Sequence, residues 1–398
     1  MQANFQDRDK EKPTISFLVP NISGTSLGFA TVYARSLSAV YPVEVVGPDI
    51  WGTGVQPMYR HGFSYTAVPA SRLYKPSRFW AEAAALAAAA DGDILFAVKA
   101  MPQTVWVALR EKARRGCPVV VCLDEWDGAL MAQRSRRQRL ACWARHWKHL
   151  TEENYYPLVE RSLSRADVVV STSSFLQRKF GGRLVRMGVD TAHFRPLESA
   201  RRAAARRELG LSEADRVIVF GGVVRPHKGV ERIVQALEAL NRPEWRLLVV
   251  GPVTDTLKAL QQSPGGQWVV AAGPKPAGEM PVWLGAADAC ILPLSTDLLA
   301  QSQVPCKVYE AMASGLAVAA SAVSDLPEVL EGAGRTFSAD DPAALLGILR
   351  EWSEHPEIMS VLGRAARERA VGLYSLARMQ DDLLRVVEDV WRGRRSAR

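Results

Sequence analysis

The sequence predicts an α/β protein built from two doubly wound domains that face each other across a cleft. Three observations lead to this fold class. The chain has 398 residues, which suits two domains better than one. Short runs that are apolar throughout alternate with helical patterns, as in parallel sheets covered by helices on both faces. A charge-rich stretch around residues 190–206, which contains Pro196, divides these patterns into two series.

Each expected strand is a short apolar run bounded by Gly, Pro or Asp, and its continuous hydrophobicity indicates burial on both faces. In the first half of the chain these runs are 15–20, 43–47, 93–98, 118–123 and 167–171. In the second half they are 217–221, 246–251, 269–272, 289–293 and 317–321. Helices are expected at 30–38, 79–90, 103–114, 230–240 and 307–313. The break between the two series predicts a domain boundary near residue 190.

Composition narrows the class of protein. The net charge of +8 suits nucleic acid, an anionic membrane or a polyanionic ligand. The five cysteines are an odd number without metal-ligand spacing, which favours reduced thiols over disulfides or a zinc site. The chain opens on a polar, charged stretch, and no run approaches the ~20 apolar residues of a membrane-spanning helix. A cytoplasmic location is therefore expected.

The segment 217–230 has the pattern of a diphosphate-binding turn. An expected strand ends at paired glycines that include Gly222, Arg225 and Lys228 follow, and a helix should begin near Gly229. A helix N-terminus offers unpaired N–H groups and a partial positive charge, and two cations beside it favour a bound diphosphate. The alternative is a solvated loop with incidental charges. The spacing is not that of a Walker loop.

The segment 304–315 places a carboxylate on a short helix. Pro305 suits the start of this helix and Gly315 its end, so Glu310 lies on it, one turn after Lys307. A carboxylate that packs into an apolar domain needs a partner, and the two adjacent hydroxyls of a ribose could both donate to it. The alternative is a structural ion pair between Glu310 and Lys307.

These segments together resemble the retaining GT-B glycosyltransferases of family 4, also called glycosyl transferases group 1. The family's "G-x-x-x-x-x-K-G" occurs at 222–229, and its "(K/L)-x-(Y/F)-E-A-M-A-x-G-x-P-V" occurs at 307–318 with Ala317 in place of Pro. Three further motifs follow the family in the right order. They are the inter-domain "G-V-D-x-x-x-F-x-P" at 188–196, the "P-x-x-L-x-x-A-D" type at 280–288 and the "G-x-P-E-V" type at 325–329.

The resemblance implies two Rossmann-like domains of GT-B type. Residues 1–190 would bind the acceptor, 191–372 would bind the nucleotide sugar, and 373–398 would form a helix that crosses back to the first domain. The implied reaction moves a sugar from a nucleoside-diphosphate sugar to an acceptor hydroxyl with retention of configuration. It needs neither a metal nor a cofactor beyond this donor. The acceptor would be a carbohydrate, a lipid-linked molecule or a small molecule, as in bacterial glycan, glycolipid or glycoconjugate biosynthesis.

The resemblance also implies roles for single residues. Arg225, Lys228, Gly222 and Gly24 would bind the donor diphosphate, and Glu310 and Lys307 the ribose or sugar. The family's first glutamate, eight positions before the second, is Ser302 here, next to Gln303, so these two become unusual candidate sugar contacts. In the first domain Asp124 stands in place of the family's histidine region and would position or deprotonate the acceptor. Alternatively Asp124 caps a loop or pairs with a nearby arginine.

Residues 133–150 form a basic, Trp-bearing stretch without a single acid. Its apolar residues fall at helical spacing, which suits a helix lying on an anionic membrane at the inner face of the cell. Packing of this helix in the core of the first domain is an equally weighted alternative, and an anionic acceptor is a third. Nucleic acid is the least favoured partner, since no recognised binding motif accompanies the stretch.

Two other functions fit part of the pattern. A GT-B-fold sugar-nucleotide epimerase would need an acid and base pair near the sugar. A non-catalytic nucleotide-sugar-binding subunit would explain Ser302 and the missing histidine.

Overall fold

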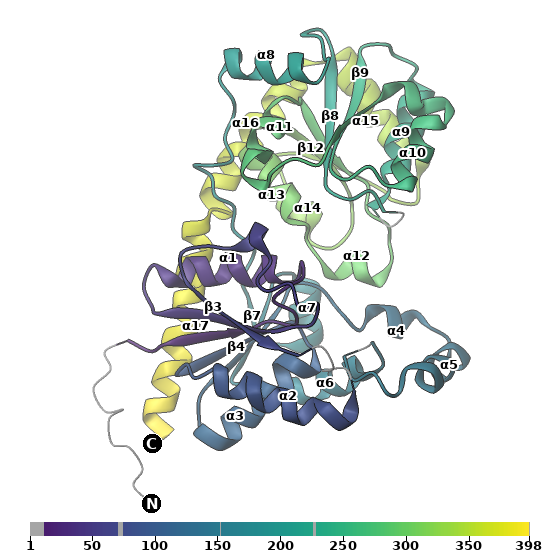
Figure 1. The fold of residues 1–398 in the computed structure, drawn as a ribbon. Coiled ribbons are helices and arrows are strands. Elements are labelled where there is room, and N and C mark those ends of the chain that lie inside the picture. Colours follow the sequence, from purple (N-terminus) through teal and green to yellow (C-terminus); the bar gives the residue numbers. More distant parts are fainter. Residues whose placement is uncertain (1–11, 71–74, 152, 226–227, 398) are drawn as a thin grey trace, which may run out of the picture. The chain divides into compact units, whose positions relative to one another are not determined.

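The computed structural model describes residues 12–70, 75–151, 153–225 and 228–397. The contacts within the chain divide it into two compact units, coloured along the sequence in Figure 1. Unit 1 comprises Met1–Arg186 together with Met379–Arg398, and unit 2 comprises Met187–Arg378. The divisions thus fall at 186/187 and 378/379, a few residues from the boundaries expected at 190 and 372.

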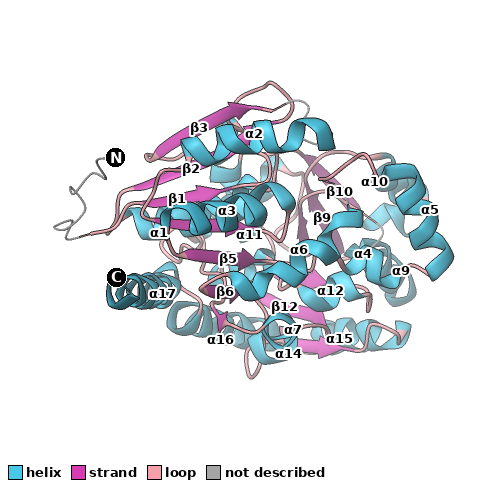
Figure 2. Cartoon of the chain, turned by 90° about the horizontal axis from the view of Figure 1, so that it is seen from below, coloured by secondary structure: helices cyan, strands magenta, loops and turns pink. Residues whose placement is uncertain are grey.

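Unit 1 contains a seven-stranded parallel sheet in the order β3-β2-β1-β4-β5-β6-β7. Figure 2 shows β3, β2 and β1 side by side. The strands are β1 (Ile15–Leu18), β2 (Val43–Asp49), β3 (Ser64–Pro69), β4 (Ile94–Val98), β5 (Val119–Leu123), β6 (Val168–Ser171) and β7 (Arg183–Leu184). The helices are α1 (Leu27–Ser38), α2 (Pro76–Ala89), α3 (Val107–Arg115), α4 (Ala129–Gln133), α5 (Arg136–His146), α6 (Tyr156–Ser162) and α7 (Ser174–Phe180).

Unit 2 contains a six-stranded parallel sheet in the order β10-β9-β8-β11-β12-β13. Its strands are β8 (Arg216–Gly221), β9 (Trp245–Val250), β10 (Val269–Gly273), β11 (Ala289–Leu292), β12 (Ala317–Ser321) and β13 (Arg335–Phe337). Its helices are α8 (Ser199–Glu208), α9 (Val230–Leu240), α10 (Asp255–Gln262), α11 (Met280–Gly285), α12 (Leu298–Ser302), α13 (Cys306–Ala313), α14 (Leu326–Val329), α15 (Pro342–Glu354) and α16 (Glu357–Leu373).

The ten expected strands are confirmed, each within a few residues of its predicted bounds. The strands that the sequence missed are β3, β7 and β13, all at or next to a sheet edge. Most residues of β3 are half-buried or exposed, so this strand lacks the continuous apolar run that marks a central strand. The other two span only a few residues each.

The charge-rich stretch that marked the break between the two series is helical in part, because residues 199–208 form α8. This helix packs on α11. Arg206 is 2% exposed, and its guanidinium donates to the carbonyl oxygens of Ala286 and Asp215, both at 2.9 Å, and to the Asp288 carboxylate at 2.8 Å. A buried arginine with these partners anchors the helix to the sheet of unit 2.

Residues from the other end of the chain complete unit 1. The long helix α17 (Leu376–Ala397) donates a hydrogen bond from Gln380 Nε2 to the Ser36 carbonyl at 2.6 Å. Near its end, Arg394 lies 3.8 Å from the Asp93 carboxylate, and both side chains are buried. Among the described residues, no helix combines the length and apolarity needed to cross a bilayer. None of the five cysteines forms a disulfide, and Cys117, Cys122 and Cys290 are buried.

Candidate functional site

The carboxyl edge of the unit 2 sheet is the first candidate site. Strand β8 lies between β9 and β11, so the chain leaves β8 toward one side and later returns on the other. Ligands of open parallel sheets bind outside the carboxyl ends of the strands at such a switch point. The chain that follows β8 is the predicted diphosphate-binding turn, of which Pro226 and His227 lie outside the described residues.

Two glycines let the loops at this edge approach one another. Gly222 has a φ of 108°, and a Cβ added there would lie 3.2 Å from Nζ of Lys307. Gly229 has a φ of 65°, and an added Cβ would lie 2.0 Å from the carbonyl oxygen of Pro293, just after β11. Only glycine fits both positions without strain. The structure therefore brings the turn after β8 against the loop after β11 and against the side chain of Lys307.

The two predicted phosphate-binding cations lie in the turn that leads into α9. Arg225 is exposed and Lys228 is half-buried. Lys228 N–H donates to the Arg225 carbonyl at 2.9 Å, and Gly229 is the N-cap of α9, which confirms the predicted helix start. Positive charge at a helix N-terminus that carries unpaired N–H groups favours an anion.

Glu310 is a half-buried carboxylate on α13, one turn after Lys307. Burial raises its pKa, and the nearby Lys307 lowers it in part. Among the described residues, no ion pair joins Glu310 to Lys307, so the structural-pair alternative is not supported. A carboxylate held in a place that disfavours its charge is a feature of ligand-binding positions.

We expect Glu310→Gln to raise the melting temperature of the free protein by roughly 2–4 °C, because the amide carries no charge to desolvate. The gain should be larger at pH 8 than at pH 5, since the raised pKa keeps more of the parent carboxyl protonated at pH 5. The same variant should bind nucleotide about 10- to 100-fold more weakly, as it loses charge-assisted hydrogen bonds. Scanning calorimetry with and without nucleotide measures both effects. Glu354→Gln, on the exposed end of α15, is the matched control.

Unit 1 contains a charge cluster that the sequence reading did not find. Lys99 follows β4 directly, is 6% exposed and has a φ of 65°, which is unusual for a residue with a side chain. Its Nζ lies 3.2 Å from Asp124, 2.5 Å from Glu125 and 3.2 Å from Asp127, all just after β5. Asp124 therefore pairs with a lysine from the neighbouring strand and not with a nearby arginine. Like the first site, the cluster lies at the carboxyl edge of its sheet.

The cluster holds more negative than positive charge in a buried setting. Burial alone would lower the pKa of Lys99, but the surrounding carboxylates raise it well above its ordinary value. Burial raises the pKa of Asp124, with Lys99 acting against the shift. For the same reasons the pKa of Asp127 rises to about 6. One carboxyl of the cluster can thus exchange a proton near neutral pH, as a group that assists an acceptor hydroxyl must do.

Asp127 should make the free energy of unfolding depend on pH between about 4 and 6.5. In this window the unfolded carboxyl, with its ordinary pKa of 3.8, has released a proton that the folded protein still holds up to about pH 6. The folded state binds more protons, so this contribution to stability falls as pH rises. Relative to the parent, Asp127→Asn should gain ~2 kcal/mol of unfolding free energy across the window, measured by urea titration. The exposed Asp340→Asn variant should show no such trend.

The match to a known protein family lies within unit 2. Residues 214–354 match the protein family described as Glycosyl transferases group 1. This part of the chain is a group 1 glycosyltransferase domain. Its bounds include the predicted diphosphate-binding turn, Lys307 and Glu310.

Relatives of the group 1 domain extend the likeness. The D-inositol 3-phosphate glycosyltransferase of Streptomyces coelicolor is 29% identical over 214 residues, which are 47% of this chain and 46% of that protein. The chain thus spans under half the length of this relative. Sucrose-phosphate synthase from Thermosynechococcus elongatus superimposes with a TM-score of 0.74 at 18% identity, covering 96% of this chain and all of that one. Anabaena HepE in complex with UDP gives 0.73 at 16% identity, covering 94% and 100%. The fold is that of the GT-B glycosyltransferases, with two parallel-sheet α/β domains.

The group 1 domain departs from the family pattern at α12. Ser302, at the position of the first glutamate, is fully buried, and its hydroxyl donates to the Leu299 carbonyl at 2.8 Å. Gln303 is half-buried, with its Nε2 3.5 Å from the same oxygen. The Ser302 side chain is therefore inaccessible to a sugar in this structure, and Gln303 is the more exposed of the two candidates.

Gly24 lies in unit 1, in the loop between β1 and α1. The Asn21 side chain closes this loop by accepting hydrogen bonds from Ser23 N–H at 3.1 Å and from the Ser23 hydroxyl at 2.7 Å. An added Cβ on Gly24 would lie 3.0 Å from Asn21 Nδ2 and 3.4 Å from the Trp51 ring. Gly24 and Asp124 thus stand in unit 1 and the other predicted site residues in unit 2. Their joint action on one substrate stays a prediction.

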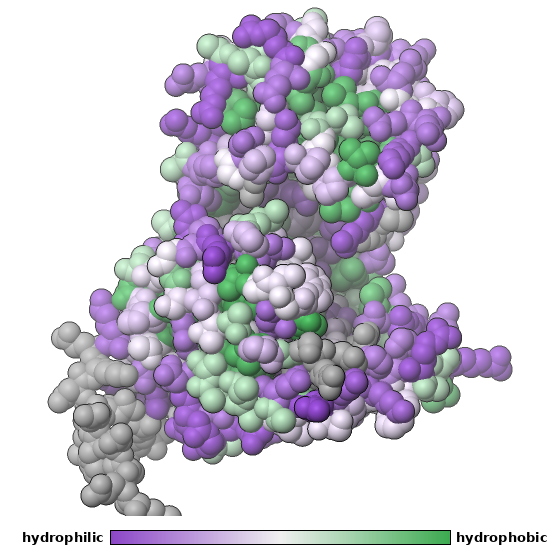
Figure 3. All heavy atoms as spheres, in the orientation of Figure 1, coloured by the Kyte–Doolittle hydropathy of each residue, from purple (hydrophilic) through white to green (hydrophobic). Residues whose placement is uncertain are grey.

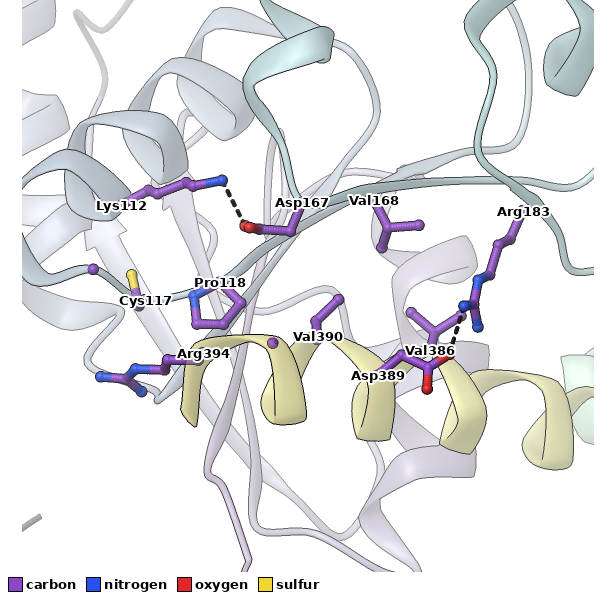
Figure 4. Close-up of a pocket in the computed structure, with 12 residues that line it drawn as sticks. Lys112, Cys117, Pro118, Asp167, Val168, Arg183, Val386, Asp389, Val390 and Arg394 are labelled. Carbon is purple, nitrogen blue, oxygen red and sulfur yellow. Dashed lines mark hydrogen bonds and ion pairs between the residues drawn. The ribbon is translucent and has the colours of Figure 1, made fainter. Parts of the chain in front are cut away.

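A pocket of about 560 Å³ in unit 1 lies at the amino ends of β5 and β6, opposite the Lys99 cluster (Figure 4). The charged side chains that line it form ion pairs with one another. Lys112 lies 2.8 Å from Asp167, and Arg183 lies 2.5 Å from Asp389 of α17. Ligands of parallel sheets bind at the other edge. We therefore interpret this pocket as a gap left where α17 packs against the sheet of unit 1, and not as a ligand site. Among the described residues, no group of three or more His, Cys, Asp or Glu side chains is placed to hold a metal ion.

Proposed function

We propose that the protein transfers a sugar from a nucleoside-diphosphate sugar to an acceptor hydroxyl. The observation that carries this proposal is the convergence of Gly222, Arg225, Lys228 and Lys307 at the switch point of the unit 2 sheet, beside the start of α9. These residues offer fixed positive charge and close backbone approach where a diphosphate would lie. The UDP in the structure of Anabaena HepE, which shares the fold, supports a nucleotide donor.

In this proposal the cations of unit 2 do the main catalytic work. Arg225, Lys228 and the N–H groups at the start of α9 stabilise the negative charge that builds up on the diphosphate as the sugar leaves. Because these groups neutralise the leaving group, transfer is expected to proceed without added metal. Glu310 accepts hydrogen bonds from the ribose hydroxyls and so fixes the donor. Lys307, which contacts Gly222, holds the turn in the position that the phosphates need.

The acceptor would bind to unit 1. Asp124, held by Lys99, would orient or deprotonate the acceptor hydroxyl. Retention of configuration would follow if the hydroxyl attacks from the face that the diphosphate leaves. Its proton would pass either to Asp124 or to an oxygen of the departing phosphate, and in the second case Asp124 only orients the hydroxyl. The acceptor class remains carbohydrate, lipid-linked or small molecule, as in bacterial glycan, glycolipid or glycoconjugate biosynthesis. The D-inositol 3-phosphate glycosyltransferase relative supports a hydroxylated acceptor.

The first experiment is a thermal-shift screen of the whole protein against nucleoside diphosphates and their sugars. A ligand that binds only the folded protein adds about 2.7 kcal/mol to the free energy of unfolding at 100 times its Kd, and this raises the melting temperature. A higher melting temperature with the nucleotides of one base would identify the donor. The protein is then incubated with this donor and a panel of acceptors, with and without EDTA. Release of nucleoside diphosphate that depends on acceptor supports the transferase, and NMR of the product reports the anomeric configuration.

Two outcomes would replace the proposal. Conversion of the nucleotide sugar into an isomer without any acceptor would indicate an epimerase. Binding of the nucleotide sugar without turnover across the panel would indicate a non-catalytic subunit.

A further inference from the structure

Helix α5 lies at the surface of unit 1, and most of its residues are exposed. No residue of this helix is buried, and Leu140 and Trp147, the C-cap residue, are 70% and 54% exposed. The alternative in which this stretch packs in the core of the first domain is therefore wrong. In Figures 1 and 2 the helix projects from unit 1, well away from the sheet. Figure 3 shows this projecting surface as mainly hydrophilic with a small hydrophobic area.

One side of α5 is fixed to unit 1. Trp143 packs edge-on against Tyr155 with ring centroids 5.1 Å apart, and the Cys142 carbonyl accepts from Asn154 Nδ2 at 3.3 Å. Just before the helix, Arg134 pairs with Glu153 at 3.0 Å. Ser135 closes the N-terminus with a capping box. The predicted helix over 133–150 is shorter than expected, but these contacts hold it in one orientation.

The exposed side chains of α5 combine cations with apolar groups. Residues three and four apart share a helix face, so Leu140, Ala144 and Trp147 line up on the solvent side. We call this side the α5 face, and its basic members are Arg136, Arg137 and Lys148, all of them exposed. Lys148 Nζ lies 5.1 Å from the centre of the Trp147 ring. Among the described residues, no carboxylate pairs with the cations of the α5 face.

We propose that the α5 face binds the surface of a bilayer that contains anionic phospholipids. Each Lys or Arg near such a surface contributes about 1 kcal/mol, and the exposed Trp and Leu can enter the boundary between head groups and acyl chains. An indole ring beside a cation is typical of the membrane interface. Nucleic acid would use the cations but would leave Leu140 and Ala144 facing water, so the mixed face favours lipid.

The proposal does not depend on the enzymatic function, because docking is measured without nucleotide. The whole protein is sedimented with vesicles of phosphatidylcholine alone, or of phosphatidylcholine mixed with phosphatidylglycerol. We expect binding to the mixed vesicles alone, and we expect it to weaken as salt increases. Arg136→Glu/Arg137→Glu should weaken binding roughly 30-fold or more. Leu140→Ser/Trp147→Ser should reduce the binding that remains at high salt.

A matched control separates this face from general positive charge. Arg201→Glu/Arg207→Glu makes the same charge change on α8, where both arginines are exposed. This control should bind the mixed vesicles with the same affinity as the parent protein. Circular dichroism should show that every variant is folded. Equal vesicle binding by the parent and Arg136→Glu/Arg137→Glu would overturn the proposal. So would a parent that ignores the mixed vesicles but binds single-stranded RNA in a way that depends on Arg136 and Arg137.

Discussion

A Lys228→Met variant should lose most of the nucleotide-dependent rise in melting temperature, and its acceptor-dependent turnover should fall by roughly 10²- to 10³-fold. Lys228 lies half-buried beside the start of α9, where Gly229 presses against the carbonyl of Pro293. The backbone that carries its side chain is therefore held in place before any ligand arrives. A preorganised cation stabilises a leaving diphosphate more than a mobile one, because little reorganisation is needed during the reaction.

Two further variants decide whether charge and position both matter. Lys228→Arg keeps the charge and should retain more activity than Lys228→Met. Arg350→Met removes an exposed cation from α15 in the same unit and should leave both binding and turnover unchanged. Full turnover by Lys228→Met would rule out the diphosphate site proposed at the β8 switch point.

The second large effect is expected on stability. Lys99→Met should lower the free energy of unfolding by about 3–5 kcal/mol, because it leaves buried carboxylates without their cation. Nζ of this lysine lies within 3.2 Å of three carboxylates, of which Asp127 is 7% exposed. Urea unfolding at pH 7.5 measures the loss. Lys112→Met is the matched control, since its pair with Asp167 is about one-third exposed and should contribute less than about 1 kcal/mol.

Charge and packing at Lys99 can be separated by a combined variant. Asp124→Asn and Asp127→Asn added to Lys99→Met remove two of the carboxylates that lost their partner. We expect at least half of the lost stability to return. No recovery would mean that the aliphatic stem and the left-handed backbone of Lys99, and not its charge, hold this edge of the sheet together.

The central strands were predictable because burial on both faces demands a continuous apolar run. Edge strands carry no such demand, so β3 and β13 left no clear pattern. Helix α8 was placed in the break between the two series because its sequence is rich in charge. The carbonyl groups that bury Arg206 come from chain positions near residues 215 and 286, which no local pattern connects to it.

The residues of the candidate sites also fall into a group that the sequence predicts and a group that it does not. Gly222, Lys228 and Glu310 could be assigned to one candidate site from the sequence because carboxyl ends of parallel strands meet at one edge. Lys99 could not, because its partners are 25 to 28 residues away along the chain. A lone lysine after an apolar strand shows no partner locally. Its position directly after β4 was the signal available, since the carboxylates follow the next strand of the same sheet.

The path of the chain through unit 1 has a consequence for biosynthesis. Residues 187–378 must leave the ribosome before α17 can reach its seat beside Asp93 and Arg183. During that interval the nascent first unit exposes the surface on which Leu383, Val386 and Val387 of α17 are later buried. Unit 2 is continuous and can fold without waiting for any later segment. Synthesis therefore completes the two units in the reverse of the order in which they begin.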